Sequence, residues 1–281
     1  METDQLLQSL TGYHLDKGQE IPLEKRFTFR KHMGKGTFGR VDLVKDRATK
    51  RKVALKAIRI SERLRWQIYK ERKALDAVVG CPFLIQRHLT WESKDYFWIA
   101  MEHASRGDLH HLLHKQGGLD IDTIRFYAAE CIIGLQQFHE KGFIHRDIKP
   151  KNVFIGREGH IRIGDFGLAS EQGEGEAGTP GYIAPEIYTG KPYSKAVDWF
   201  SFGVMLFVLV TGVPAKRCRA TIVPAYGLDC DLEDLIIKLL HENPTERLGQ
   251  NRDIRSHPFF STINWDDLQQ LKITPPFIPV S

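Results

Sequence analysis

The feature that most constrains this chain is a polar run at residues 145–152, HRDIKPKN, followed by DFG at residues 165–167. Together they bring a carboxylate, a lysine and two oxygen ligands into one stretch. Phosphoryl transfer to a hydroxyl needs a carboxylate near that hydroxyl, cations on the phosphate oxygens and hard oxygen ligands for magnesium. A polar hairpin loop is the alternative, since Asp, Asn, Lys and Pro are ordinary turn residues. As a set, these residues favour phosphoryl transfer.

Within the run, each polar residue has a candidate role. Asp147 is the carboxylate that would meet the hydroxyl. Lys149 lies two positions later, so in an extended segment its ammonium points to the same side as Asp147. Asn152 and Asp165 offer a neutral and an anionic oxygen for a metal ion.

A glycine-rich segment, GKGTFG, occupies residues 34–39. Its glycines allow the backbone to approach phosphates closely. A dinucleotide-binding fold is the alternative, but it needs a helix directly after the glycines, and RVDLV at residues 40–44 alternates like a strand. We therefore expect a flap over phosphates, formed by Gly34, Lys35, Gly36, Thr37, Phe38 and Gly39.

A lysine on a predicted strand forms the third piece. Lys56 ends the strand-like VALK at residues 53–56, and Glu71 lies in residues 61–79, where apolar residues recur at helical spacing. Glu71 can hold Lys56 for contact with phosphates. Alternatively it is one more solvated charge in a highly charged helix.

Composition indicates an intracellular protein. A chain of 281 residues suggests about two domains or lobes. Its four cysteines lack paired spacing, so neither a disulfide framework nor a zinc site is indicated. No signal peptide is evident, and the most apolar stretch, residues 204–210, is too short to span a bilayer. We expect a cytoplasmic or nuclear protein. Acidic residues interrupt the basic clusters behind the net charge of +5, so no nucleic-acid partner is expected.

The order of these motifs, ending with APE at residues 184–186, resembles the eukaryotic protein kinases over residues 27–260. Within this family, a lysine at position 149 and a threonine at position 179 resemble the pattern of the serine/threonine class. The stretches at residues 177–186, 196–204, 244–249 and 275–279 resemble the AGC group, which contains protein kinases A, G and C, and Gly181 is similar to the G-protein-coupled receptor kinases.

The resemblance implies an α+β, bilobal fold. A small β-rich lobe with one main helix would cover residues 27–103, and a larger, mostly helical lobe residues 104–260. Residues 1–26 would be an extension and residues 261–281 a truncated AGC-type tail. We expect helices at residues 121–139 and 232–240 and a hairpin from residues 152–155 and 161–163.

The implied activity is transfer of the ATP γ-phosphate to serine or threonine hydroxyls of proteins, with ATP and magnesium as cofactors. Asp147, Lys149, Lys56, Glu71 and Thr179 would form the catalytic set, and Asn152 and Asp165 would hold magnesium. Met101 would gate the pocket, with nucleotide contacts from the backbone of Glu102 and Ala104, from Asp108 at the ribose, and from Val41, Ala54 and Phe154.

Several departures from the family sharpen the prediction. Gly175 stands where phosphorylation-activated relatives carry a threonine or serine, so we hypothesise that Glu174 or Glu176 neutralises Arg146; simple mobility of this stretch is the alternative. Lys151 and Val208 replace acidic residues that select arginine. We therefore expect weak arginine preference and acidic protein substrates.

Other departures support an alternative, a pseudokinase scaffold or allosteric regulator. Arg87 falls at an expected apolar position, where a carboxylate partner or an alignment shift would explain it. The segment at residues 213–231 is markedly shorter than in relatives, so we expect the helix that commonly follows Gly212 to be absent or remodelled. In related kinases an aromatic motif of the tail returns to brace the small lobe against the helix that carries Glu71, and no such motif follows here. Either the sequence is cut, or the brace is dispensable, or a partner fills this groove of the small lobe. Because the ion-binding set is complete, we favour the active kinase. Glu186 and Arg247 are expected to form a buried ion pair.

Overall fold

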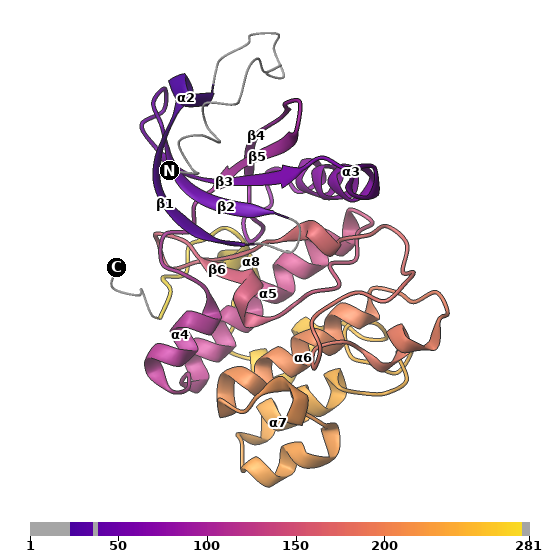
Figure 1. Ribbon diagram of the computed structural model, residues 1–281. Helices are drawn as coiled ribbons and strands as arrows, with labels where there is room; N and C mark the ends of the chain where they lie inside the picture. The colour runs from indigo at the N-terminus through magenta and orange to yellow at the C-terminus, as the bar shows by residue number, and fades with distance from the viewer. Residues whose placement is uncertain (1–22, 36–38, 277–281) are drawn as a thin grey trace. The chain divides into compact units, whose positions relative to one another are not determined.

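The computed structural model describes residues 23–35 and 39–276. The chain divides into two compact units, each described by itself below (Figure 1). Unit 1 comprises residues 1–80 and 85–103, and unit 2 comprises residues 81–84 and 104–281. Three of the predicted phosphate-binding residues, Gly36, Thr37 and Phe38, lie outside the described residues, as do most of the predicted extension and the end of the tail.

Unit 1 is built on a five-stranded antiparallel sheet with the order β1-β2-β3-β5-β4. Helix α3 connects β3 to β4, and a short helix, α2, precedes β1. The bounds are α2 (Leu23–Arg26), β1 (Phe27–Lys35), β2 (Arg40–Asp46), β3 (Lys52–Arg59), α3 (Glu62–Ala77), β4 (Arg87–Glu92) and β5 (Tyr96–Glu102). The chain after the glycine-rich segment therefore continues as a strand, as its alternation predicts, and not as the helix of a dinucleotide-binding fold.

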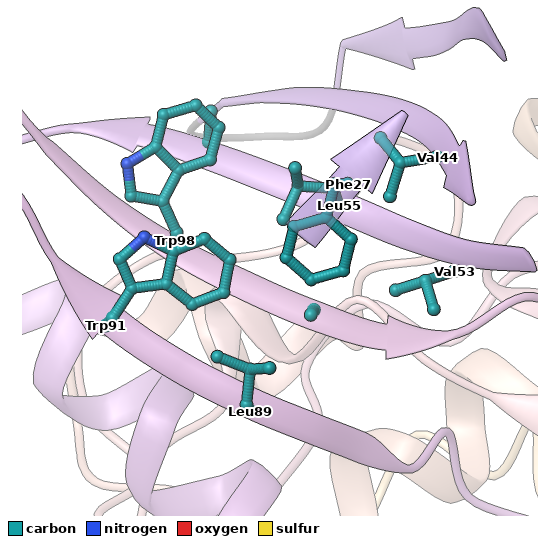
Figure 2. Close-up of a cluster of buried hydrophobic side chains, with 9 residues drawn as sticks. Phe27, Val44, Val53, Leu55, Leu89, Trp91 and Trp98 are labelled. Atoms are coloured by element: carbon teal, nitrogen blue, oxygen red, sulfur yellow. The ribbon is translucent and has the colours of Figure 1, made fainter. Parts of the chain in front are cut away.

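One face of this sheet carries a compact aromatic core, shown in Figure 2. The rings of Phe27 and Trp91 stack with centroids 5.9 Å apart, and those of Trp91 and Trp98 with centroids 6.0 Å apart. Val53 and Leu55 of β3 belong to the same cluster. Because side chains alternate along a strand, residues 54, 56 and 58 point to the opposite face. All six residues from 53 to 58 are buried, so β3 is covered on both faces.

Arg87 on β4 has the carboxylate partner that one of our two explanations requires. Its guanidinium contacts Asp76 of α3, and its side chain is 17% exposed. The arginine therefore ties the last strand of the sheet to the helix. It is compatible with folding because its charge is paired and remains partly hydrated.

Unit 2 is mostly helical, with one two-stranded sheet made of β6 (Val153–Ile155) and β7 (Ile161–Ile163). This hairpin and the two helices predicted from periodicity are all present. The helices are α4 (Leu109–Gln116), α5 (Ile121–Glu140), α6 (Ala196–Thr211), α7 (Cys230–Leu239) and α8 (Trp265–Gln269). Among the described residues, no helix is both long enough and apolar enough to cross a membrane.

The sequence explains why α6 lies in the interior of unit 2. Nearly every residue from Ala196 to Leu209 is buried, which is expected of a helix that is apolar on all sides. Helix α6 packs against both α5 and α7. It ends at Gly212, whose left-handed backbone suits a helix C-terminus. The segment between Gly212 and α7 contains two 3₁₀ helices, Ala215–Arg217 and Ala220–Tyr226, and no α-helix.

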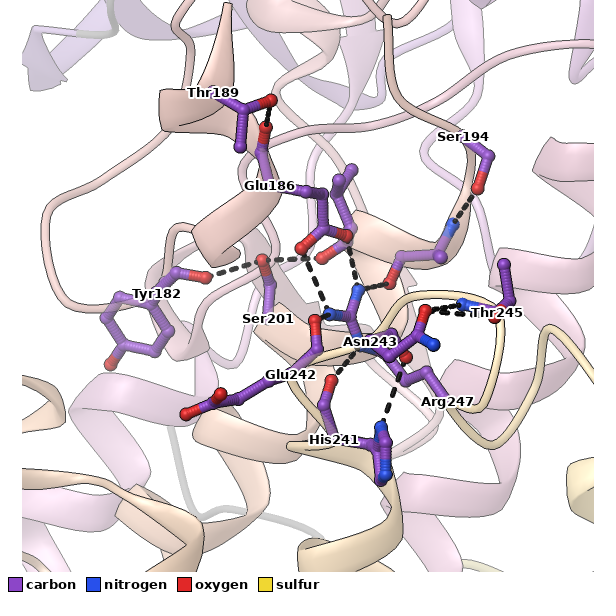
Figure 3. A network of polar contacts seen from close by, with 12 residues as sticks. Tyr182, Glu186, Thr189, Ser194, Ser201, His241, Glu242, Asn243, Thr245 and Arg247 are labelled. Atoms are coloured by element: carbon purple, nitrogen blue, oxygen red, sulfur yellow. Dashed lines mark hydrogen bonds and ion pairs between the residues drawn. The ribbon is translucent and has the colours of Figure 1, made fainter. Parts of the chain in front are cut away.

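The expected pair of Glu186 and Arg247 forms the centre of a polar network in unit 2, shown in Figure 3. Arg247 donates to both carboxylate oxygens of Glu186, at 2.5 and 3.0 Å. Its remaining donors reach the main-chain oxygens of His241, Ala196 and Glu242. The Arg247 side chain is completely buried, so its charge depends on these acceptors.

We predict that Arg247→Ala lowers the free energy of unfolding by about 3–5 kcal/mol, because it leaves the Glu186 carboxylate without its charge partner. Urea denaturation measures this change. Lys238→Ala is the control, since Lys238 pairs with Asp234 at a half-exposed site and should cost at most about 1 kcal/mol. Equal effects of the two substitutions would contradict the prediction.

Candidate active site

In unit 1, the predicted partners Lys56 and Glu71 are in contact. Lys56 Nζ donates to Glu71 Oε1 at 2.6 Å, and each residue is 2% exposed. Lys56 is fixed by its position in the sheet, opposite Val41 on β2 and Ile99 on β5. Glu71 is on the buried side of α3. A lysine held this way has a defined direction, which suits it to bind an anionic group.

The last residue of the glycine-rich segment, Gly39, lies close to β3. A Cβ atom added at Gly39 would lie 2.2 Å from the carbonyl oxygen of Ala57, so only glycine fits where β2 begins. Gly34 and Lys35 are in β1, opposite Val41 and Arg40. The two ends of the segment are thus held by neighbouring strands.

In unit 2, Asp147, Lys149 and Thr179 form a closed triangle of hydrogen bonds. Lys149 Nζ donates to Asp147 Oδ2 at 2.7 Å and to Thr179 Oγ1 at 2.6 Å. The Thr179 hydroxyl donates to Asp147 Oδ1 at 2.6 Å. Asp147 is 3% exposed. The triangle fixes the carboxylate and places a cation beside it, although Thr179 comes 32 positions later in the chain.

The two predicted metal ligands are on adjacent segments of unit 2. Asn152 is buried and donates through Nδ2 to the main-chain oxygen of Asp147 at 2.8 Å and to its Oδ2 at 2.9 Å. The main-chain N–H of Gly164 donates to the Asn152 carbonyl, which brings the neighbouring Asp165 to this region. Asp165 has a left-handed backbone, with φ 58°. An amide oxygen and a carboxylate are hard ligands of the type that Mg²⁺ prefers.

The predicted nucleotide contacts are divided between the units. In unit 1, Ala54 on β3 is buried and Val41 on β2 is half-buried. The N–H of Glu102 donates to the Gln86 carbonyl, so this group is already used within unit 1. In unit 2, Asp108 and the half-buried Phe154 form an isolated β-bridge, and Asp108 also caps α4 by accepting from the N–H of His111. Ala104 begins the second segment of unit 2.

The segment that carries Asp147 is anchored by a buried carboxylate of α6. Asp198 accepts from the main-chain N–H groups of His145 and Arg146, both at 2.8 Å, and lies 2.8 Å from His139 Nε2. Burial raises the pKa of Asp198, but the hydrogen bond from His139, the charges of His139 and His145 and the N–H of His145 outweigh it, so this pKa lies below its ordinary value. Asp198 therefore stays ionised and holds the loop by charge-assisted hydrogen bonds.

Our hypothesis about Arg146 is wrong in its choice of partner. Within the described part of the chain, no ion pair links Arg146 to Glu174 or Glu176, and both glutamates are exposed. Arg146 instead donates to the main-chain oxygens of Leu168 and Glu174 and to the Tyr193 hydroxyl, at 2.7, 2.8 and 3.0 Å. Neutral oxygens can satisfy the guanidinium because the loop turns its carbonyls inward, while the hydrated carboxylates stay in solvent.

Tyr193 also holds this loop directly. Its hydroxyl donates to the Gly175 carbonyl at 2.7 Å, and its main-chain N–H donates to the Gly173 carbonyl at 2.8 Å. A Cβ atom at Gly173 would lie 1.7 Å from the Tyr193 carbonyl oxygen, so the pairing requires glycine. Tyr193 packs beside a cluster of buried residues that includes Ile144 and Val197. Sequence patterns do not single out Tyr193 or Asp198, because each acts on residues far away in the chain.

We predict that Tyr193→Phe loosens the loop at residues 173–178, because the carbonyls and Arg146 lose their shared hydroxyl. In the variant, amide hydrogen exchange at position 193 and its neighbours should become roughly tenfold faster. Tyr188→Phe is a matched control, since Tyr188 is 57% exposed. Unchanged exchange in Tyr193→Phe would show that the hydroxyl does not order the loop.

Comparison with known proteins agrees with this geometry. The model of the protein kinase domain family matches residues 27–260. Mouse protein kinase C delta type is 38% identical over 278 residues, which cover 91% of this chain and 41% of that protein. The serine/threonine-protein kinase YPK1 of Saccharomyces cerevisiae is 36% identical and is matched over 90% of this chain and 40% of its own length. This chain thus spans about two fifths of the length of these two relatives.

A human relative is matched over more of its own length. The cAMP-dependent protein kinase catalytic subunit PRKX is 34% identical over 269 residues, which cover 88% of this chain and 75% of that protein. The resemblance to AGC serine/threonine kinases is therefore confirmed, together with the bilobal fold class. With a family model covering most of its length and relatives above 30% identity, this chain belongs to the protein kinase family.

Proposed function

We propose that this chain is an active serine/threonine kinase that transfers the γ-phosphate of ATP to protein hydroxyls, in the cytoplasm or nucleus. The observation that carries the proposal is the triangle of Asp147, Lys149 and Thr179. It holds one buried carboxylate and one ammonium in a fixed arrangement. This pair suits a reaction in which a hydroxyl loses a proton while negative charge develops on a phosphoryl group.

Each residue of the triangle would have one task. Asp147 orients the substrate hydroxyl and accepts its proton. Lys149 balances the charge of Asp147 and of the transferring phosphoryl group. Thr179 fixes both, because its hydroxyl accepts from Lys149 and donates to Asp147. Catalysis of this kind depends mainly on positioning and electrostatic stabilisation.

The chain also has suitable residues for the nucleotide and the metal ion. Lys56, held by Glu71, would bind phosphate oxygens. Asn152 and Asp165 provide the hard oxygen ligands that fit Mg²⁺, which when bound would neutralise phosphate charge. Val41, Ala54 and Phe154 would offer apolar contacts to the base. All the charged residues of the predicted set are present in the sequence.

The scaffold alternative loses one of its arguments. Arg87, which looked out of place in the sequence, has a carboxylate partner in Asp76 and joins β4 to α3. It is therefore a structural ion pair of unit 1 and no sign of a damaged core. The active kinase remains the better account.

We predict that Asp147→Asn lowers phosphoryl transfer to protein substrates by at least about 100-fold, because the amide cannot accept the hydroxyl proton. The assay follows transfer from radiolabelled ATP to a degenerate peptide library. Glu158→Gln is the matched control: it makes the same carboxylate-to-amide change at an exposed position in the turn between β6 and β7 and should leave the rate unchanged. If wild type and Asp147→Asn incorporate equally little label, the scaffold reading replaces this one.

Substrate selection is proposed to depend on Lys151. This residue is exposed on the 3₁₀ helix Pro150–Asn152, two positions from Lys149. Val208, at the second position where arginine-directed relatives carry an acid, is 7% exposed. An exposed lysine here repels basic peptides and attracts acidic ones.

We predict that Lys151→Glu raises kcat/KM for peptides with arginine N-terminal to the target hydroxyl by roughly tenfold relative to acidic peptides, since reversing one charge changes binding by about 1–2 kcal/mol. A positional-scanning peptide array on both proteins measures the shift. Strong arginine selection by the wild-type protein would refute the proposal, even if the kinase activity itself is confirmed.

A further inference from the structure

Helix α4 carries three histidines that the kinase reaction does not use, and two of them face each other. His110 and His114 are four positions apart, which places them one above the other on the same side of a helix. Their rings meet edge to face, with centroids 4.3 Å apart. His110 is half-buried and His114 is exposed. His111, one position further along, points in a different direction.

The distance between the two rings fits a shared metal ion. His110 Nε2 and His114 Nε2 lie 3.2 Å apart. Histidine nitrogens bind Zn²⁺ at about 2.0–2.1 Å, and in a tetrahedral site two such nitrogens are about 3.3 Å apart. Two imidazole nitrogens at this distance need something between them, either a proton or a cation. Both nitrogens belong to the same rigid helix, so a metal ion would need little rearrangement.

The nearby side chains of Lys151 and Asp108 act on His110 with opposite charges. Burial lowers the pKa of His110, and the neighbouring charges of His114, Lys151 and His111 lower it further, while Asp108 opposes them. Neutral imidazole is the form that binds metals. Lys151 disfavours a second cation nearby, whereas the Asp108 carboxylate partly offsets this repulsion.

We propose that His110 and His114 form a two-histidine binding site for a divalent transition-metal ion such as Zn²⁺, with water completing its coordination. In the described part of the chain, no group of three or more His, Cys, Asp or Glu side chains could hold a metal ion. The site is thus an exposed chelate with exchangeable positions. Imidazole ligands make it selective for Zn²⁺, Cu²⁺ or Ni²⁺ over Mg²⁺. The proposal does not depend on the kinase activity.

Histidine footprinting tests the site on the intact wild-type chain. Diethyl pyrocarbonate modifies exposed neutral imidazoles, and mass spectrometry locates each modified residue. With added ZnCl₂, modification of His110 and His114 should fall at least fivefold, while His111 in the same peptide stays reactive and acts as an internal control. MgCl₂ should protect none of the three. Protection by zinc should weaken as the pH falls, because protons compete for the imidazoles.

Substitutions provide a second, independent measurement. The chain has 12 histidines, so calorimetric zinc titrations are compared as differences between variants. His110→Ala and His114→Ala should each remove the same binding event, and His111→Ala should retain it. The proposal is overturned if zinc up to about 1 mM leaves His110 and His114 fully reactive, which would mean that the rings share only a proton. Equal protection of His111, or equal binding by all three variants, would overturn it as well.

Discussion

The organisation of unit 2 around its predicted catalytic residues depends on one buried carboxylate. Asp198 lies on α6, the most completely buried helix of the unit, and is itself fully buried. It accepts the main-chain N–H groups of His145 and Arg146, directly before Asp147. A buried anion without such donors would be costly. The requirement to satisfy this charge therefore fixes the loop, and the loop fixes the side chains that follow it.

From this anchor, order extends in two directions. Forward along the chain, Asp147 is held by Lys149, Thr179 and Asn152. In the other direction, the Arg146 side chain donates to the carbonyls of Leu168 and Glu174 and to the Tyr193 hydroxyl. The carbonyls of residues 173–175 thus accept hydrogen bonds from the Arg146 guanidinium and from the hydroxyl and main-chain N–H of Tyr193. The resemblance implies that phosphorylation-activated relatives carry a threonine or serine at the position of Gly175, and we propose that these hydrogen bonds take the place of the phosphate.

Sequence patterns reveal those parts of the molecule that depend on local chemistry. The alternation at residues 40–44 and the apolar spacing in residues 61–79 and 121–139 predict β2, α3 and α5 well. The polar run at residues 145–152 identifies its candidate residues because each role needs a particular side chain. Even the pairing of Glu71 with Lys56 follows from motif order, although local composition favours a solvated charge.

Other contacts leave no pattern in the sequence. Arg146 donates to the Tyr193 hydroxyl and to main-chain carbonyls. Every residue has a carbonyl, so such contacts cannot be predicted from residue types. The exposed Glu174 and Glu176 looked like better partners, but desolvating them would cost more than using the main chain. The ion pair of Arg87 could not be predicted from the sequence, because only the fold brings Asp76 next to it. The pair His110 and His114 has helical spacing, but only the structure shows that the two rings face each other.

We propose as the central claim, which rests on the proposed kinase activity, that the site needs no phosphate, because residues 172–178 contain no serine, threonine or tyrosine and Arg146 donates to oxygens of the chain itself. The most direct measurement compares phosphoryl transfer to a protein substrate before and after phosphatase treatment of the full chain, with complete dephosphorylation verified by mass spectrometry. The account predicts equal rates for the two samples. A loss of activity on treatment, restored when the chain is phosphorylated again, would contradict it.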